Sequence, residues 1–303
     1  MADDGDFEKC WLETTGPLHL LQKAPVQENE TELGYFDRLG SVYIPPECRT
    51  GQIKDLGAFP SNVIRHQDIR GVIHAHSTYS DGLHSVKKMA EESERLGYSY
   101  LGITDHSKIA VYADGMDEEK SQQQWAEIDH LNREKREFTI LKGIECDILS
   151  DGSLDFDDHF RSGFQFVIAS VHTNIKMDID KATSRLITAI EHPQTNILGH
   201  PTGRLLLGRD GYPLHIDKVI DACAVNQVAI EINANPYRLD LDWKYIQLAV
   251  DKGVQLCINP DAHTKESITN IHFGVIIARK GWLPAESCLN TRNVDDFLAF
   301  CEK

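Results

Sequence analysis

The chain has 303 residues, with 31 lysines and arginines against 47 aspartates and glutamates, and a formal net charge of -16. It contains no apolar run of the roughly 18 residues that a membrane-spanning helix needs, and its acidic N-terminus lacks the apolar segment of a secretory signal. The negative charge argues against a long, non-specific grip on duplex DNA, which needs a basic face. The 7 cysteines form no C-x-x-C pair, which is typical of reduced thiols in a cytoplasmic protein.

Residues 1–67 differ from the rest of the chain in their pattern of apolar residues and prolines. They hold few long apolar runs, and the Pro45-Pro46 pair interrupts any regular element. We expect short helices and an extended linker there, with too little apolar surface to form a large core. This N-terminal extension is expected either to pack on the larger body formed by residues 68–303 or to fray.

From Asp68 onward, short apolar runs alternate with stretches of helical spacing. The runs are continuously apolar, which is typical of buried parallel strands. We expect strands at 71–75, 100–104, 138–144, 165–171, 196–199, 228–232 and 255–259. We expect helices at 85–96, 118–136, 179–191, 216–225, 243–252 and 266–279. Three helices are followed by glycine, which predicts left-handed caps at Gly97, Gly253 and Gly281.

Seven strand–helix units predict an α/β fold, a distorted (β/α)7 TIM-like barrel, with an open doubly wound sheet as the alternative. The sequence has no G-x-G-x-x-G and no G-x-x-x-x-G-K-[ST], so neither dinucleotide nor P-loop binding is indicated.

Metal-competent side chains follow six of the seven predicted strands. The carboxyl ends of parallel strands meet at one mouth of a barrel, so these side chains are expected to converge. The residues are His74, His76, Asp81, His106, Glu145, His172, His200, Asp261 and His263. A single histidine at a strand end is most often an ordinary hydrogen-bonding residue, but six strand ends together favour metal binding. So many ligands predict a cluster of two or three divalent ions, and imidazole with carboxylate suits Zn, Mn or Fe equally well.

These residues and their neighbours resemble the PHP (polymerase and histidinol phosphatase) superfamily, and within it the C-terminal PHP domain of bacterial family X DNA polymerases. The resemblance rests on IPPECR at 44–49, DIRGVIHAHSTYSDG at 68–82, LKGIECDILSDGSLDF at 141–156, GHPTGRLLLGRDGY at 199–212, EINANPYRLDL at 231–241 and NPDAHT at 259–264. It implies a distorted seven-stranded barrel with a trinuclear metal site. Residues 7–21 resemble a degenerate copy of the polymerase thumb. The chain has no segment long enough to hold the polymerase palm.

The resemblance also implies how the metal ligands divide into three groups. One ion would be held by His74, His76, Glu145 and Asp261, a second by Glu145, His172 and His200, and a third by Asp81, His106 and His263. Asp105 is expected behind the ligands, where it would orient one of them, with a cap at the end of its strand as the alternative role.

Catalysis is expected to involve Glu145, Asp261, His263 and Arg204, with a metal-bridging hydroxide attacking phosphorus. Arg204, Arg209 and Arg238, which follow the fifth and sixth strands, are the candidates for binding phosphate, with surface salt bridges as their alternative role.

Three functions remain open at this point. The first is a metal-dependent phosphoesterase that cleaves phosphodiester bonds, with 3′-5′ exonuclease-like action on single-stranded DNA or DNA 3′ ends. It requires aromatic groups along a groove, for which Tyr237, Trp243 and Trp282 are candidates. The second is a phosphomonoesterase that acts on a small metabolite, as histidinol phosphatases do, and the third is a non-catalytic, metal-stabilised scaffold. A separate polymerase chain is a candidate partner, and no membrane association is expected.

Overall fold

The computed structural model describes residues 4–50, 59–134 and 137–302. Within these residues, seven parallel strands form one sheet, and each strand pairs with the next one along the chain. The strands are Gly71–Val72 (β1), Tyr100–Ile103 (β2), Thr139–Asp147 (β3), Phe166–Ser170 (β4), Ile197–Leu198 (β5), Ala229–Asn233 (β6) and Leu256–Asn259 (β7). All seven lie at the predicted places, and β3 runs on to Asp147 because its second half pairs with the whole of β4.

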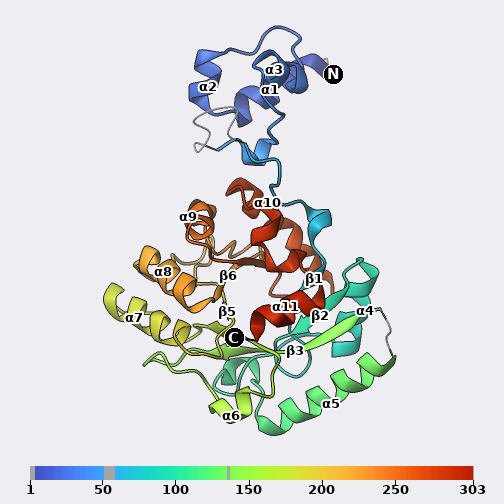
Figure 1. The fold of residues 1–303 in the computed structure, drawn as a ribbon, viewed down its shortest axis with the longest axis vertical. Helices are drawn as coiled ribbons and strands as arrows, with labels where there is room; N and C mark the ends of the chain where they lie inside the picture. The colour runs from blue at the N-terminus through green and yellow to red at the C-terminus, as the bar shows by residue number, and fades with distance from the viewer. Residues whose placement is uncertain (1–3, 51–58, 135–136, 303) are drawn as a thin grey trace.

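The sheet curls into a nearly closed barrel (Figure 1). A parallel bridge between Ala75 and Ala262 joins the chain just beyond β1 to the chain just beyond β7. At the other end of this seam, the buried Asn290 side chain donates to the carbonyl oxygens of Gly71 and Ile258 and accepts from the Ile258 amide. Both contacts join β1 to β7, so the predicted barrel is confirmed and the open doubly wound sheet is wrong.

Helices cover the outside of this barrel, as the helical spacing predicted. They are Val86–Arg95 (α4), Glu118–Glu134 (α5), Asp158–Arg161 (α6), Ile179–Ile190 (α7), Ile216–Asn226 (α8), Ile246–Asp251 (α9), Ile271–Lys280 (α10) and Val294–Cys301 (α11). The short α6 and the final α11 were not predicted. No helix in the described part of the chain is long and apolar enough to cross a membrane.

Two of the three predicted glycine caps are present. Gly97 and Gly253 both have positive φ angles, of 90° and 77°, after their helices. Gly281 has a φ of -89°, so the prediction of a left-handed cap there is wrong. The left-handed residue is instead the next one, Trp282, with a φ of 59°. Its buried indole belongs to the apolar cluster of the N-terminal region and lies edge-on to Phe59 at 5.6 Å between ring centroids, and this packing outweighs the local preference for glycine.

The inside of the barrel changes from apolar at one end to polar at the other. Alternate residues of a strand face the same side, so Leu141 and Glu145 of β3 both point inward, one near each end. Around Leu141, the Phe166 ring fills the space that Gly143 leaves open, since a Cβ there would lie 2.4 Å from that ring. From α11, Phe297 packs against the ring of Phe166 at 5.3 Å and closes this end. The polar end stays open.

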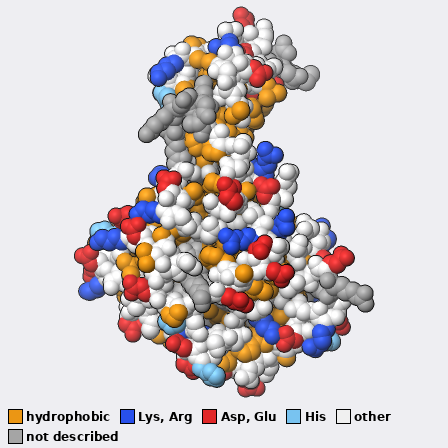
Figure 2. All heavy atoms as spheres, viewed as in Figure 1, with side chains coloured by type: hydrophobic (Ala, Val, Ile, Leu, Met, Phe, Trp, Pro, Cys, Tyr) orange, Lys and Arg blue, Asp and Glu red, His pale blue; other side chains and the backbone are white. Residues whose placement is uncertain are grey.

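The N-terminal helices Asp4–Thr15 (α1), Leu18–Lys23 (α2) and Glu32–Arg38 (α3) form a separate head above the barrel (Figure 1). The head has its own small apolar cluster, in which Leu12 and Phe36 are buried, and some apolar side chains show on its surface (Figure 2). Trp282 of the barrel joins this cluster, and its indole N–H donates to the Cys48 carbonyl at 2.8 Å. The placing of a domain boundary at residue 67 stays a prediction.

Candidate metal centre

The open, polar end of the barrel carries all nine predicted ligands, and the strand order explains how they meet. His74 and His76 follow β1, and the bridge from Ala75 to Ala262 sets them beside Asp261 and His263, which follow β7. A second bridge sets His106, after β2, beside Glu145 of β3. The remaining ligands follow neighbouring strands or occupy the loop after β1: His172, His200 and Asp81.

The first donor set consists of His74, His76 and Asp261. The Nε2 atoms of the two histidines lie 3.2 Å apart, and Nε2 of His76 lies 3.1 Å from Oδ1 of Asp261. Oε2 of Glu145 completes the set at 3.5 Å and 3.6 Å from the two Nε2 atoms. Asp261 has a φ of 50°, a left-handed conformation that aspartate tolerates better than most residues, and it holds its carboxylate toward the histidines.

The second donor set lies on the other oxygen of the same carboxylate. Oε1 of Glu145 is 3.0 Å from Nε2 of His200 and 3.3 Å from Nε2 of His172. Glu145 therefore lies between two groups of nitrogen donors, with one oxygen facing each group. This is the arrangement that a carboxylate bridging two ions requires.

The third donor set lies toward the solvent and combines Asp81, His106 and His263 with the Nδ1 side of the His76 ring. Oδ1 of Asp81 is 3.3 Å from Nε2 of His263, 3.7 Å from Nε2 of His106 and 3.8 Å from Nδ1 of His76. These three sets correspond to the three predicted ligand groups, and His76 also reaches the third. A fourth set, which was not predicted, combines His106 and His172 with Asp147. The role of these residues as metal ligands stays a prediction.

The donor chemistry fits divalent ions. Every donor is an imidazole nitrogen or a carboxylate oxygen, which suits Zn, Mn or Fe. Nδ1 of His76 and Nδ1 of His200 are buried and have no hydrogen-bond partner within the described residues. A buried polar atom without a partner is costly, and a cation in the third donor set would give Nδ1 of His76 a partner in the tautomer whose proton is on Nε2.

The charges of the site also favour bound cations. Although burial opposes ionisation, His172, His74 and His106 hold the pKa of Glu145 well below its usual value. Burial likewise disfavours a charged His74, but Glu231, Glu145 and Asp261 raise its pKa well above the usual value. Divalent ions bound between these carboxylates would offset the same negative charge.

Two carboxylates next to the predicted ligands were not predicted, and one of them, Asp147, also forms a donor set with His106 and His172. Glu231 of β6 is fully buried, and its Oε1 lies 2.6 Å from Nδ1 of His74. Its Oε2 accepts from the backbone N–H of His200 at 2.7 Å. Asp147 of β3 lies 3.1 Å from Nδ1 of His172. The sequence did carry a signal for Glu231: it is a charged residue inside the apolar strand VAIEIN, and a buried carboxylate requires partners.

Asp105 contributes to the site less directly than predicted. Its carboxylate accepts from the backbone N–H of Ser77 at 2.7 Å and from the hydroxyls of Ser77 and Ser80. Gln124 of α5 donates to it at 2.6 Å. Asp105 therefore fixes the loop between His76 and Asp81 and contacts neither ligand in these hydrogen bonds.

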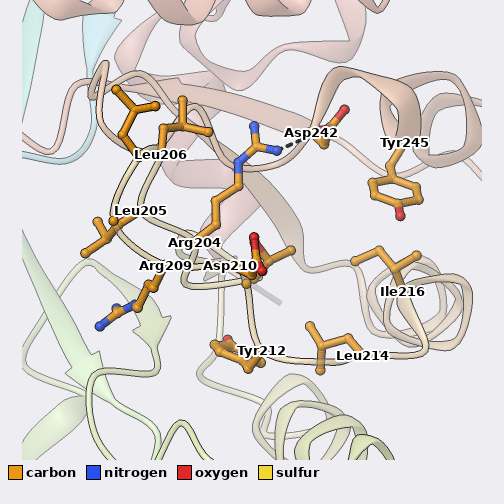
Figure 3. Close-up of a pocket in the computed structure, with 14 residues that line it drawn as sticks. Arg204, Leu205, Leu206, Arg209, Asp210, Tyr212, Leu214, Ile216, Asp242 and Tyr245 are labelled. Atoms are coloured by element: carbon orange, nitrogen blue, oxygen red, sulfur yellow. Dashed lines mark hydrogen bonds and ion pairs between the residues drawn. The ribbon is translucent and has the colours of Figure 1, made fainter.

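The three predicted phosphate-binding arginines differ in where they point. Arg238 approaches the centre, with Nε 3.7 Å from Oδ2 of the predicted ligand Asp261. Arg204 turns toward the chain after β6, where it donates to the carbonyls of Arg238 and Leu239 and pairs with Asp242 at 2.7 Å (Figure 3). Nε of Arg209 donates to a backbone carbonyl at 3.1 Å.

Arg204 and Arg209 line a groove of about 620 Å³ formed by residues 202–216 with Asp242 and Tyr245 (Figure 3). These contacts give Arg204 a structural function, and its predicted catalytic role is not tested by them. Of the predicted groove aromatics, Tyr237 is exposed beside Arg238, whereas Trp282 is buried against the head and is excluded as a surface group.

Comparison with known proteins places this geometry in a family. A model of the PHP domain matches residues 73–235. The chain is 41% identical, over 287 residues, to the DNA polymerase/3′-5′ exonuclease PolX of Bacillus subtilis. That match covers 94% of this chain and 50% of the relative, so the chain spans about half the length of that protein. A protein of Clostridium acetobutylicum named a probable phosphatase is 25% identical over 232 residues, which is 72% of this chain and 89% of that protein.

Two solved structures share the fold. The hisK protein of Listeria monocytogenes aligns with 65% of this chain and 97% of its own, with a TM-score of 0.52 and 14% identity. Histidinol phosphate phosphatase of Lactococcus lactis, solved with zinc, L-histidinol and phosphate, aligns with 69% of this chain and 93% of its own. Its TM-score is 0.50 and its identity 18%. At such identities the likeness shows the barrel alone.

Proposed function

The chain belongs to the PHP domain family and is therefore a metal-dependent phosphoesterase; we propose that it cleaves phosphodiester bonds and removes nucleotides from the 3′ end of a DNA strand. The observation that carries this proposal is the 41% identity, over nearly the whole chain, to a relative named as a 3′-5′ exonuclease. The nine converging side chains and the open mouth of the barrel support it.

The proposed centre holds two or three divalent ions in the donor sets built around Glu145, His76 and Asp81. Such ions, when bound, stabilise the charge that develops on phosphate and lower the pKa of water. The task of the protein is to fix their positions. Glu145 links two donor sets because its oxygens face opposite groups of histidines. Glu231 holds His74 in the orientation that turns Nε2 toward the centre.

Arg238 is proposed to bind the substrate phosphate. Its guanidinium is partly exposed and its only ion pair with a described residue is the 3.7 Å contact to Asp261. Such a long contact leaves its donors available for a phosphate oxygen, and an arginine can donate two parallel hydrogen bonds to one phosphate. Arg204 and Arg209, which donate to backbone carbonyls, are proposed to shape the neighbouring groove.

The substrate class is tested by one comparative assay. Protein reconstituted with Mn is incubated separately with a 5′-labelled single-stranded oligodeoxynucleotide, with histidinol phosphate and with p-nitrophenyl phosphate. We expect a ladder of DNA products shortened from the 3′ end and much slower turnover of both monoesters. Turnover of a monoester beside intact DNA would contradict the proposal and favour a small-metabolite phosphatase.

A matched pair of variants ties any activity to the centre. His74→Ala removes a buried donor and is expected to abolish DNA cleavage. The control, His130→Ala, changes a histidine on α5 that is exposed and paired only with Glu134 of its own helix. It should cleave DNA at the wild-type rate. Equal activity in both variants would show that the hydrolysis comes from elsewhere.

The head is proposed to be a remnant of a polymerase thumb, with residues 1–67 forming an extension to the phosphoesterase domain of residues 68–303. The chain spans about half the length of its polymerase relative. A separate polymerase chain is proposed as a partner of the head. Size-exclusion chromatography of the protein with a purified family X polymerase core tests this. Co-elution is expected, and independent elution would contradict it.

A further inference from the structure

An exposed tyrosine lies at the edge of the metal centre without a function in the fold. Tyr112 belongs to the loop after β2, and 64% of its surface is exposed. Its ring centroid lies 6.1 Å from the ring of His106 and 6.2 Å from that of His172. His106 and His172 share one donor set with Asp147, and each also belongs to another set, so Tyr112 stands beside several donors of the centre.

The loop around Tyr112 is held firmly, so the exposure of the ring is built into the structure. Ala110 and Ala113, on either side, are 0% and 2% exposed. The N–H of Met116 donates to the carbonyl of His106 at 2.8 Å and closes the base of the loop. The N–H of Ile109 donates to Asp155 at 2.8 Å. The loop therefore buries two alanines and leaves most of a large aromatic ring in water, where the ring adds little to folding stability.

Other apolar side chains surround the mouth in the same way. Leu83 follows β1 and is 72% exposed, and its N–H donates to the carbonyl of the ligand His263. Tyr237 follows β6 beside Arg238 and is 69% exposed. Together with Tyr112 they come from three separate loops. The charged centre therefore has a rim that is apolar at several points, and such a rim suits a substrate with flat or apolar parts next to its phosphate.

The chemistry of Tyr112 points to contact through the ring. With 64% of its surface exposed, the ring presents an aromatic face to whatever lies over the two histidines. Aromatic faces bind nucleobases by stacking with little dependence on the base.

We infer that Tyr112 stacks on the nucleobase of the 3′-terminal nucleotide while its phosphodiester lies over the metal centre. The inference rests on the proposed function and adds to it the part of the substrate that is recognised. It explains how an acidic protein binds a DNA end, because stacking requires no positive charge. It also predicts low sequence preference, since every base has an aromatic face.

The test combines a change in the protein with a change in the substrate. Tyr112→Ala and Tyr112→Phe are assayed on a single-stranded oligodeoxynucleotide with a normal 3′ nucleotide and on one whose 3′ nucleotide is abasic. We expect Tyr112→Ala to raise KM for the normal end roughly tenfold, with kcat little changed, and to leave the abasic end unaffected. Tyr112→Phe should resemble wild type on both substrates. Val111→Ala, at an 81% exposed position of the same loop, is the matched control and should change neither.

The outcomes separate this inference from the proposed function. Equal loss of activity by Tyr112→Ala on normal and abasic ends would overturn the stacking inference and leave the exonuclease proposal intact. Wild-type behaviour of Tyr112→Ala on the normal end would do the same. Failure of the wild-type protein to cleave any DNA would overturn both. Metal content and the midpoint of thermal unfolding, measured for each variant, should match wild type, because Tyr112 is neither a donor nor part of the core.

Discussion

Glu231 gives the sharpest test of how the centre is built. All four of its hydrogen-bond partners are donors: Nδ1 of His74 and the Asn259 amide face Oε1, while the His200 backbone N–H and the Asn233 amide face Oε2. Burial opposes its ionisation, but the charge and hydrogen bond of His74 lower its pKa, so it is a carboxylate that only accepts. Glu231→Gln keeps the shape and replaces one acceptor by an NH₂ donor.

Neither orientation of the glutamine satisfies the site. In each, an NH₂ group faces two donors, and two buried donors lose their acceptor at about 1–3 kcal/mol each. Part of that cost falls on His74 or on His200, which belong to different donor sets. Changing the residue behind a metal ligand typically costs about 10- to 100-fold in metal affinity, and that range equals about 1.4–2.7 kcal/mol.

The assay is competition for Mn or Zn against a chromophoric chelator at fixed pH. We expect Glu231→Gln to weaken metal binding by about 10- to 100-fold and to lower the stability of the metal-free protein. The control, Glu127→Gln, changes a carboxylate that accepts from the Tyr79 hydroxyl away from the donor sets. It should bind metal as wild type does. Wild-type affinity in Glu231→Gln would refute the idea that this carboxylate orients the ligands.

Three further predictions concern protons, the barrel seam and phosphate. Although burial disfavours their charged forms, neighbouring carboxylates raise the pKa of His172 to about 10 and that of His263 to about 9. Metal binding must therefore displace protons, and the metal affinity should rise from pH 6.5 to 8.5. A pH-independent affinity in the chelator assay would contradict this. Asn290→Leu leaves strand groups on both sides of the seam unpaired and should lower the free energy of unfolding in urea by roughly 3 kcal/mol, whereas an unchanged midpoint would show that the seam closes without it. Arg238→Ala should raise KM for DNA about tenfold at unchanged metal content, more than Arg209→Ala does, and equal effects would contradict the assignment of phosphate to Arg238.

The barrel and the meeting of the nine side chains followed from one physical rule. Continuous apolar runs indicate buried parallel strands, and parallel strands in a barrel end at one mouth. The residue after each run was therefore enough to predict that His74, Glu145 and Asp261, far apart in the sequence, lie together. The family resemblance added the division into three donor sets, which strand ends alone do not provide.

What the sequence could not predict depends on contacts between distant segments. The direction of the Arg204 side chain is set by carbonyls of Arg238 and Leu239, which no local pattern relates to it. The seam residue Asn290 lies in a short turn with no periodicity, and only its partners on two strands give it a function. The end of α10 differs from the prediction because burial of Trp282 determines the backbone there.

The central claim is that the strand ends build one multinuclear metal centre that hydrolyses phosphate esters. Native mass spectrometry of protein reconstituted with excess Mn or Zn, after removal of loosely bound ions, tests it most directly. The account predicts two or three ions per chain in the wild type and fewer in Glu145→Ala, which removes the carboxylate between two donor sets. A wild-type protein that retains one ion or none, or a Glu145→Ala variant with the full number, would contradict it.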